Sequence, residues 1–139
     1  MGNHYHLVVE TPEPTLAAGM HLINGSFAQY YNYRHRRTGH LFEARYHSEL
    51  ITTEAHLLET YRYVVLNPVR AGLCEHPEDW PWSSYRALAG IGEGVSFLDV
   101  GHALRRIGLD GPGRHTTYRD FVLSACERPG PARAVLSAR

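Results

Sequence analysis

The sequence predicts an α+β fold in which helices pack on an antiparallel sheet. Two stretches, residues 5–9 and 40–51, are rich in aromatic and β-branched side chains or alternate between apolar and polar ones, which is typical of strands. Between and after them, over residues 15–37 and 53–66, apolar residues recur at the helical period of about 3.6. A chain of 139 residues is the size of one domain and can bury an ordinary core.

A pair of histidines lies at the start of the first predicted strand: His4 directly precedes it and His6 is its second residue. Successive side chains of a strand alternate between its faces and rise about 3.3 Å per residue. His4 and His6 therefore project to the same side, about 6.6 Å apart at the backbone, whereas Tyr5 is expected to enter the core with Leu7 and Val9. This arrangement predicts a paired metal site.

The helix predicted over residues 15–37 has Thr15 as its N-cap. Its apolar side chains form one stripe, which we expect to belong to the core: Leu16, Met20, Ile23, Phe27, Tyr30 and Tyr31. At its far end, Arg34, Arg36 and Arg37 are mixed with aromatic residues, a combination that can stack bases and hold phosphates. A solvated helix end explains the same residues equally well.

The second predicted strand follows the helix stop at Thr38 and Gly39. Its alternation places Phe42 and Tyr46 on a packing face, and Arg45 and His47 on the opposite face.

The helix predicted over residues 53–66 begins at Thr53 and carries the most informative pattern of the chain. Its apolar residues cluster on one side, and Tyr63 lies nearly opposite the middle of that cluster. Asn67 lies one turn further along the same polar face, at i+4 from Tyr63. Because Pro68 disfavours helical geometry in the residue before it, we expect the helix to end at Asn67.

The second half of the chain is predicted to hold an aromatic loop over residues 77–85 and short helices over 98–107 and 117–127. We expect a catalytic region over residues 1–88 and a C-terminal helical extension over 89–139.

Composition excludes several classes of protein. The net charge is zero, which argues against binding nucleic acid by bulk electrostatics, although every positive side chain is an arginine. No apolar run approaches the roughly 20 residues of a membrane span, and the sequence does not begin like a signal peptide, so we expect the cytoplasm. The two cysteines lack the spacing of a zinc site.

Together, these residues are the parts of a metal-assisted phosphodiester transesterase. His4, His6 and the carboxamide oxygen of Asn67 would hold one divalent cation, and two imidazoles with one amide suit Mg²⁺ or Mn²⁺. Tyr63 would be the nucleophile that forms a covalent phosphotyrosine.

Four stretches also resemble a known family, in the family's order: residues 2–9 (GNHYHLVV), 39–46 (GHLFEARY), 63–73 (YVVLNPVRAGL) and 77–85 (PEDWPWSSY). They resemble the REP-associated tyrosine transposases, bacterial members of the HUH (His-hydrophobic-His) superfamily of single-strand DNA transposases. The resemblance implies a ferredoxin-like transposase fold whose antiparallel sheet carries the HUH strand. It also implies that His4, His6 and Asn67 are metal ligands and that Tyr63 is the catalytic residue.

The activity implied by the resemblance is DNA transposition: nicking and joining of single-stranded DNA at hairpin-forming repeats, with a 5′-phosphotyrosine intermediate. The expected partner is single-stranded DNA with a hairpin, and the expected DNA-binding residues are Arg34, Arg36, Arg37, Arg45 and Arg70. The alternative is a catalytically inactive remnant that still binds single-stranded or hairpin DNA.

Two departures from the family pattern concern the scaffold. Gly2 stands where the family motif has proline, and family members carry a strand and a helix before the histidine pair. An upstream start, a degenerate copy and a partner chain that supplies a strand in a homodimer all fit this observation. A further rival is a small metal hydrolase in which His40 or His47 completes the ligand set, and such an enzyme would not need Tyr63.

Overall fold

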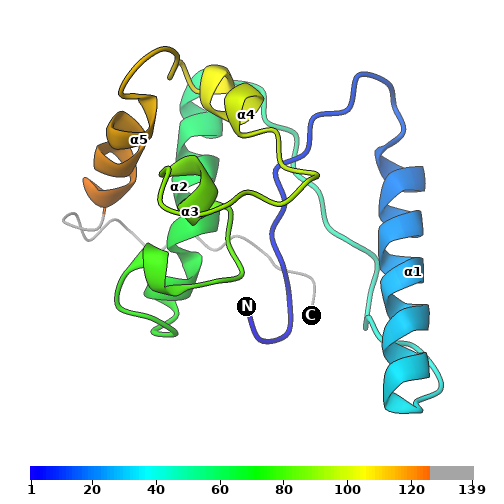
Figure 1. Ribbon diagram of the computed structural model, residues 1–139. Helices are drawn as coiled ribbons and strands as arrows, with labels where there is room; N and C mark the ends of the chain where they lie inside the picture. Colours follow the sequence, from blue (N-terminus) through cyan, green and yellow to red (C-terminus); the bar gives the residue numbers. More distant parts are fainter. Residues whose placement is uncertain (126–139) are drawn as a thin grey trace. The chain divides into compact units, whose positions relative to one another are not determined.

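The computed structural model describes residues 1–125, which divide into two compact units. One unit is Gly2–Leu50, and the described residues from Ile51 onward form the other. The helices labelled in Figure 1 are α1 (Leu16–His35), α2 (Glu54–Arg70), α3 (Tyr85–Leu88), α4 (Val100–Arg106) and α5 (Arg114–Leu123), and a 3₁₀ turn, η1 (Pro77–Asp79), lies between α2 and α3.

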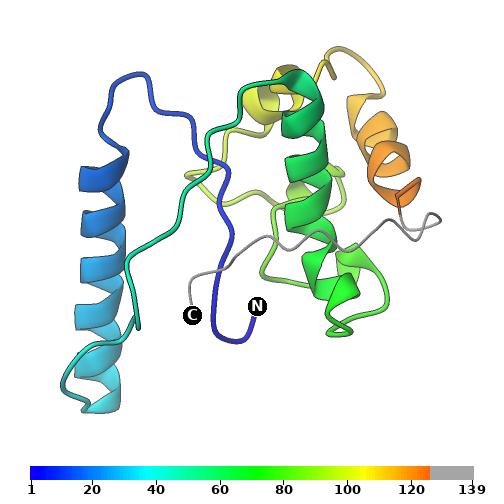
Figure 2. The same ribbon diagram turned by 180° about the vertical axis from the view of Figure 1, so that it is seen from behind.

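The predicted α+β fold, with its antiparallel ferredoxin-like sheet, is wrong for the part of the chain that the structure describes. Residues 1–125 form helices, turns and irregular segments, and no strand. Residues 5–9 and 40–51 run as irregular chain in both views (Figures 1 and 2). Alternation of side chains predicts the local shape of a strand, but a strand also needs a neighbour that accepts its backbone hydrogen bonds, and two short strands are marginal by themselves.

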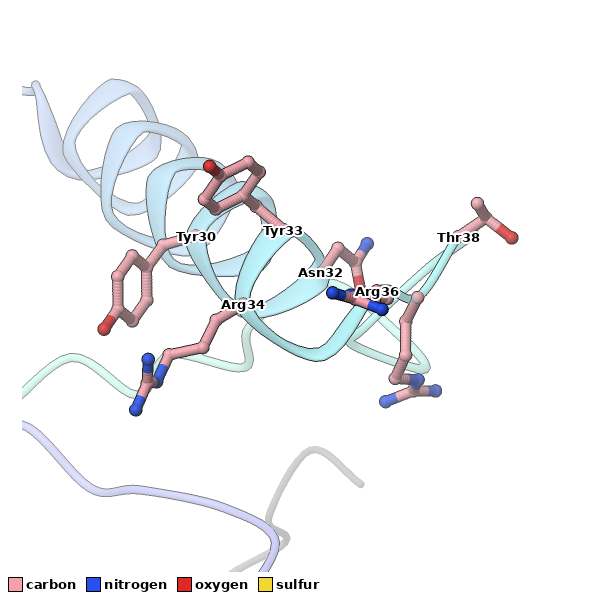
Figure 3. Close-up of a pocket in the computed structure, with 7 residues that line it drawn as sticks. Tyr30, Asn32, Tyr33, Arg34, Arg36 and Thr38 are labelled. Carbon is pink, nitrogen blue, oxygen red and sulfur yellow. The ribbon is translucent and has the colours of Figure 1, made fainter.

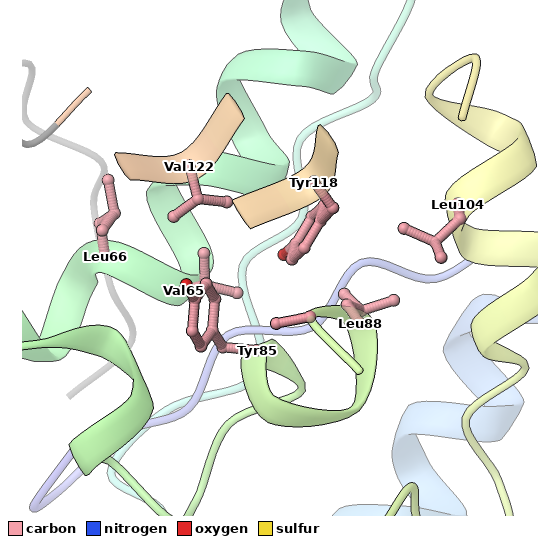
Figure 4. Packing of buried hydrophobic residues seen from close by; sticks show 8 residues of the cluster. Val65, Leu66, Tyr85, Leu88, Leu104, Tyr118 and Val122 are labelled. Carbon is pink, nitrogen blue, oxygen red and sulfur yellow. The ribbon is translucent and has the colours of Figure 1, made fainter. Parts of the chain in front are cut away.

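The core of the unit from Ile51 onward lies where α2, α3, α4 and α5 meet (Figure 4). Each of these helices contributes at least one side chain with almost no exposed surface, and burial of one such side chain contributes roughly 1.5–3 kcal/mol. The residues of this cluster are Val65, Leu66, Tyr85, Leu88, Ala89, Leu104, Tyr118 and Val122. The tyrosine predicted to lie in an aromatic loop, Tyr85, is thus a core residue, whereas its neighbour Trp82 is exposed.

Helix α2 begins as predicted and ends later than predicted. The Thr53 hydroxyl oxygen accepts a hydrogen bond from the backbone N–H of His56 at 3.1 Å, which confirms the N-cap. The helix then continues through Asn67 and Pro68 to Arg70, so the expected end at Asn67 is wrong. Pro68 leaves one carbonyl of the preceding turn without its helical N–H partner, but the ring is buried, and packing outweighs the local preference.

Short helices also occur close to the two other predicted positions. Helix α4 lies within the predicted range 98–107, and α5 begins three residues before the predicted range 117–127. Residues 126 and 127 of that prediction lie outside the described residues. The division into residues 1–88 and 89–139 concerns function rather than packing, and it stays a prediction.

The unit Gly2–Leu50 is organised around the single helix α1. The helix begins directly after Thr15, as predicted, but the Thr15 side chain makes no capping hydrogen bond. Three aromatic rings from different segments meet at the side of the helix. The ring of Phe42 lies 6.3 Å from that of Tyr5 and 6.2 Å from that of Phe27. The predicted core stripe is only partly correct, because Met20 is buried while Phe27 is half exposed. Tyr5, Leu7 and Val9, which we expected in the core, are exposed as well.

The hydroxyl of Tyr118 gives a prediction about stability. The oxygen is buried and has no hydrogen-bond partner within residues 1–125, and burial raises the pKa of this phenol. A buried polar group without a partner has lost its bonds to water and gained nothing, so Tyr118→Phe should stabilise the fold by about 1 kcal/mol. Thermal unfolding should show a rise of about 4–8 °C for a unit of this size. The control Tyr33→Phe removes an exposed hydroxyl and should leave the unfolding temperature unchanged, whereas a fall in Tyr118→Phe would contradict the prediction.

Candidate active site

The two histidines of the first segment lie against each other. The ring centroids of His4 and His6 are 5.0 Å apart, and the ring planes are nearly perpendicular at 83°. Both side chains are half buried. Two nitrogen atoms that share one cation lie roughly 3 Å apart, given metal–nitrogen distances of about 2.1 Å, and rings at this separation can reach that geometry by small rotations.

Asn3, which was not among the predicted site residues, orients one of these rings. The Nδ1 atom of His4 lies 2.8 Å from the Oδ1 atom of Asn3. Because a carboxamide oxygen can only accept a hydrogen bond, the Nδ1 atom of His4 carries the ring proton and its N–H donates a hydrogen bond to Asn3. The lone pair of the neutral ring is then on Nε2, which is free to bind a cation, as in metal sites whose ligands are held by an outer hydrogen bond. An asparagine directly before the histidine pair was the available signal.

The pKa values of both histidines favour the neutral, metal-binding form. Partial burial lowers the pKa of His4, and the positive amino terminus lowers it further. Burial also lowers the pKa of His6, with additional contributions from the charge of His4 and from the amino terminus. Since an imidazole binds metal only when it is unprotonated, the pair is prepared for a cation near neutral pH.

Within the described part of the chain, no histidine, cysteine or carboxylate forms a three-residue metal cluster with this pair. Residues 1–125 contain no cluster of three or more such side chains arranged to hold a metal ion. His40 and His47 belong to the same unit as His4 and His6, and the structure does not join either of them to the pair. The ligand set of the hydrolase and the amide ligand Asn67 both stay predictions.

The predicted nucleophile and amide ligand lie on one face of α2. Tyr63, Asn67 and Arg70 follow one another at i, i+4 and i+7, which places them along one stripe of the helix. Tyr63 and Asn67 are half buried, and the guanidinium carbon of Arg70 lies 6.0 Å from the centroid of the Tyr63 ring. Arg70 lies on this stripe only because α2 continues past Pro68. Because the helix was predicted to end at Asn67, the position of the Arg70 guanidinium beside the Tyr63 ring was not predicted.

The basic residues at the end of α1 line an open pocket of about 690 Å³ (Figure 3). Arg34, Arg36 and Arg37 are all exposed there, and Asn32 and the tyrosines at positions 30 and 33 complete the lining together with Thr38. Arg45 is also exposed, in the segment that follows.

The predicted site residues thus belong to two different units of the chain. His4, His6 and the arginines up to Arg45 belong to Gly2–Leu50, whereas Tyr63, Asn67 and Arg70 belong to the unit from Ile51 onward. Within residues 1–125, no helix has both the length and the apolar character that a membrane crossing requires. Comparison of the chain with protein-family models, with curated proteins and with solved structures gave no match.

Proposed function

We propose that this protein nicks and joins single-stranded DNA at hairpin-forming repeats as a metal-dependent tyrosine transposase of the cytoplasm. The observation that carries the proposal is the contact between the His4 and His6 rings, whose lowered pKa values favour the neutral form that can bind a cation. The alignment of Tyr63 with Asn67 and Arg70 on α2 supports it, as does the resemblance of four stretches to the REP-associated tyrosine transposases.

The cation would be held by the two imidazoles and by the carboxamide oxygen of Asn67. These donors suit Mg²⁺ or Mn²⁺, since the chain offers nitrogen and oxygen here and no thiolate. Held by these three residues, an ion would supply polarisation of a phosphate oxygen and would orient the phosphodiester for in-line attack. Asn3 holds the His4 ring in the required tautomer.

The chemical step would belong to Tyr63. Its hydroxyl oxygen attacks the phosphorus, a tyrosine O–P bond forms, and the bond from phosphorus to the 3′ oxygen breaks. Tyr63 loses its phenolic proton and the leaving 3′ oxygen gains one, so no net proton is released. The 5′ phosphate stays on Tyr63. Attack by a second 3′-hydroxyl reverses the step and joins the strands without an external energy source. Arg70, beside the phenol, would offset the negative charge that accumulates on the phosphate.

The experiment that tests the proposal is incubation of the full chain with a labelled single-stranded hairpin oligonucleotide and Mn²⁺, followed by denaturing electrophoresis. We expect a band in which the label migrates with the protein, because the phosphotyrosine bond survives denaturation. Removal of the metal with EDTA should eliminate the band, and added Mn²⁺ or Mg²⁺ should restore it.

A catalytically inactive DNA-binding remnant is the second candidate, and the basic pocket at the end of α1 favours it. That pocket contains neither the histidine pair nor Tyr63, so it can bind a strand without chemistry. This function predicts oligonucleotide binding that is indifferent to Mn²⁺, together with no covalent band under any condition.

A further inference from the structure

Four helices within residues 1–125 end in the same backbone motif. Glycine occupies the left-handed position after α2, α3 and α4 (Gly72, Gly90 and Gly108), and an arginine occupies it after α1. At the end of α2, Gly72 has φ of +67°, and the backbone N–H groups of Gly72 and Leu73 donate to Val69 and Pro68. At the end of α1, Arg36 has φ of 51° and takes the equivalent position. Glycine is the usual residue there, because a side chain strains the left-handed backbone. Within residues 1–125, Arg36 is the only residue other than glycine with positive φ.

The arginines at this helix end are not needed as caps. The backbone N–H of Arg37 donates to the carbonyl of Asn32 at 2.9 Å, and that of Arg36 donates to the carbonyl of Tyr33 at 3.3 Å. The helix dipole amounts to about half an elementary charge, so one cation is sufficient to offset it. Residues 30–40 nevertheless carry three arginines and no acidic residue. The excess of positive charge on a strained backbone indicates a ligand with negative charge.

The aromatic rings beside these arginines are of two kinds. The ring of Tyr31 is engaged within the protein, since it lies 4.2 Å from the ring of His35 and 5.8 Å from the guanidinium carbon of Arg37. In contrast, Tyr33 is 88% exposed and Tyr30 is 61% exposed. Figure 3 shows Tyr30 projecting on the same side of the helix as Arg34, and Tyr33 projecting from another side.

The loop that carries the charges is fixed in place. The side-chain amide of Asn32 donates to the carbonyl of Gly39 at 2.9 Å, which ties the helix to the residues after it. The arginines at positions 36 and 37 therefore lie on a closed turn rather than on a free end. The lining of the pocket of about 690 Å³ contains this asparagine, both exposed tyrosines and all three arginines.

Single-stranded nucleic acid is the ligand whose chemistry matches these features. Its phosphates pair with guanidinium groups, and its unpaired bases offer flat faces that stack on exposed tyrosine rings. A duplex hides those faces, and an anionic membrane surface has none, so neither gives the tyrosines a role.

We propose that the end of α1 is a docking site for a single strand, in which Arg34, Arg36 and Arg37 hold the phosphates and Tyr33 stacks on a base. The site binds the strand without a metal. The inference rests on the proposed function for the identity of the strand as DNA.

The test measures fluorescence anisotropy of a labelled, unstructured oligothymidine of 12 nucleotides with the full chain in EDTA. We expect Arg36→Gly to weaken binding about tenfold and to reduce the slope of log affinity against log salt by about 0.7, the value for one lost phosphate contact. Glycine relieves the left-handed backbone, so the unfolding temperature of this variant should stay the same or rise. If Arg36 had only a structural role, Arg36→Gly would not lose affinity while its unfolding temperature stayed the same or rose.

Two further variants test the stacking. Tyr33→Ser should weaken binding by about tenfold, whereas Tyr33→Phe keeps the ring and should bind like the wild type. Arg105→Gln, which removes an exposed charge on α4, is the matched control and should leave the affinity unchanged within about twofold.

Four outcomes would overturn the inference: full affinity in Arg36→Gly, equal losses in Arg36→Gly and Arg105→Gln, equal affinity for a duplex of the same length, or displacement of the oligonucleotide by anionic phospholipid vesicles. Since the assay contains neither a metal nor a hairpin, a lack of covalent adduct leaves the inference intact while the proposed function fails. Conversely, adduct formation together with full affinity in Arg36→Gly leaves the proposed function intact and rejects this site.

Discussion

Tyr63→Phe abolishes the covalent adduct between the protein and a hairpin oligonucleotide in Mn²⁺, while the affinity for the same oligonucleotide changes by less than about twofold. This result is expected because phenylalanine keeps the ring on α2 and removes only the oxygen that attacks phosphorus. Denaturing electrophoresis measures the adduct, and anisotropy without metal measures the binding. Tyr33→Phe, which removes an exposed hydroxyl of the other unit, should form the adduct at the wild-type level.

The position of the adduct can be read directly from the sequence. Trypsin cleaves after Arg62 and Arg70, and the resulting peptide of residues 63–70 contains a single tyrosine. After nuclease trimming, the mass of the remaining nucleotide should appear on this peptide. A nucleotide on any other peptide, or an adduct that persists in Tyr63→Phe, would show that a different group is the nucleophile.

The second large effect concerns the histidine pair. His4→Ala and His6→Ala should each raise the Mn²⁺ concentration needed for half-maximal adduct by more than about 100-fold, since loss of even an outer-sphere partner costs 10–100-fold in metal affinity. The measurement is adduct yield across a Mn²⁺ titration at fixed oligonucleotide concentration.

The matched control for this pair is His21→Ala, which removes an exposed histidine of α1 in the same unit. Its Mn²⁺ midpoint should equal that of the wild type. A wild-type midpoint in either His4→Ala or His6→Ala would remove that residue from the ligand set, and a common decrease in all three variants would indicate a general effect of histidine loss.

The helices could be predicted from the sequence because their signals are local. Thr53 at the start of α2 and Gly72 just past its end form hydrogen bonds with residues within one turn. The cap at Thr53 is formed as expected. The local rule failed at Asn67, where burial of Pro68 in the core outweighs the preference of the residue before it. A property of one segment is predictable when no distant part of the chain decides it.

The predicted sheet failed for the opposite reason. Alternation over residues 5–9 and 40–51 describes single segments, whereas a sheet is a relation between segments, and nothing local specifies the pairing. The core stripe of α1 shows the same limit. Its periodicity is correct, but Phe27 is half exposed, because periodicity marks a face without supplying a partner.

The placement of the candidate site residues within each unit was partly predictable, and their chemistry stays a prediction. The spacing of His4 and His6 anticipated that their rings would lie together, and the spacing of Tyr63 and Asn67 placed both on one stripe of α2. The hydrogen bond from His4 to Asn3 depends on a side-chain rotation that spacing does not encode.

The proposed mechanism requires the stripe of α2 with Tyr63 and Asn67 to face a cation held by His4 and His6. Paramagnetic broadening by Mn²⁺ of the side-chain amide signals of ¹⁵N-asparagine tests it directly. The account predicts that the amides of Asn3, beside His4, and of Asn67, on α2, broaden at the same Mn²⁺ concentration. Broadening of Asn3 with an unchanged Asn67 signal would show that the ion binds the histidines without the helix, and would contradict the proposed mechanism.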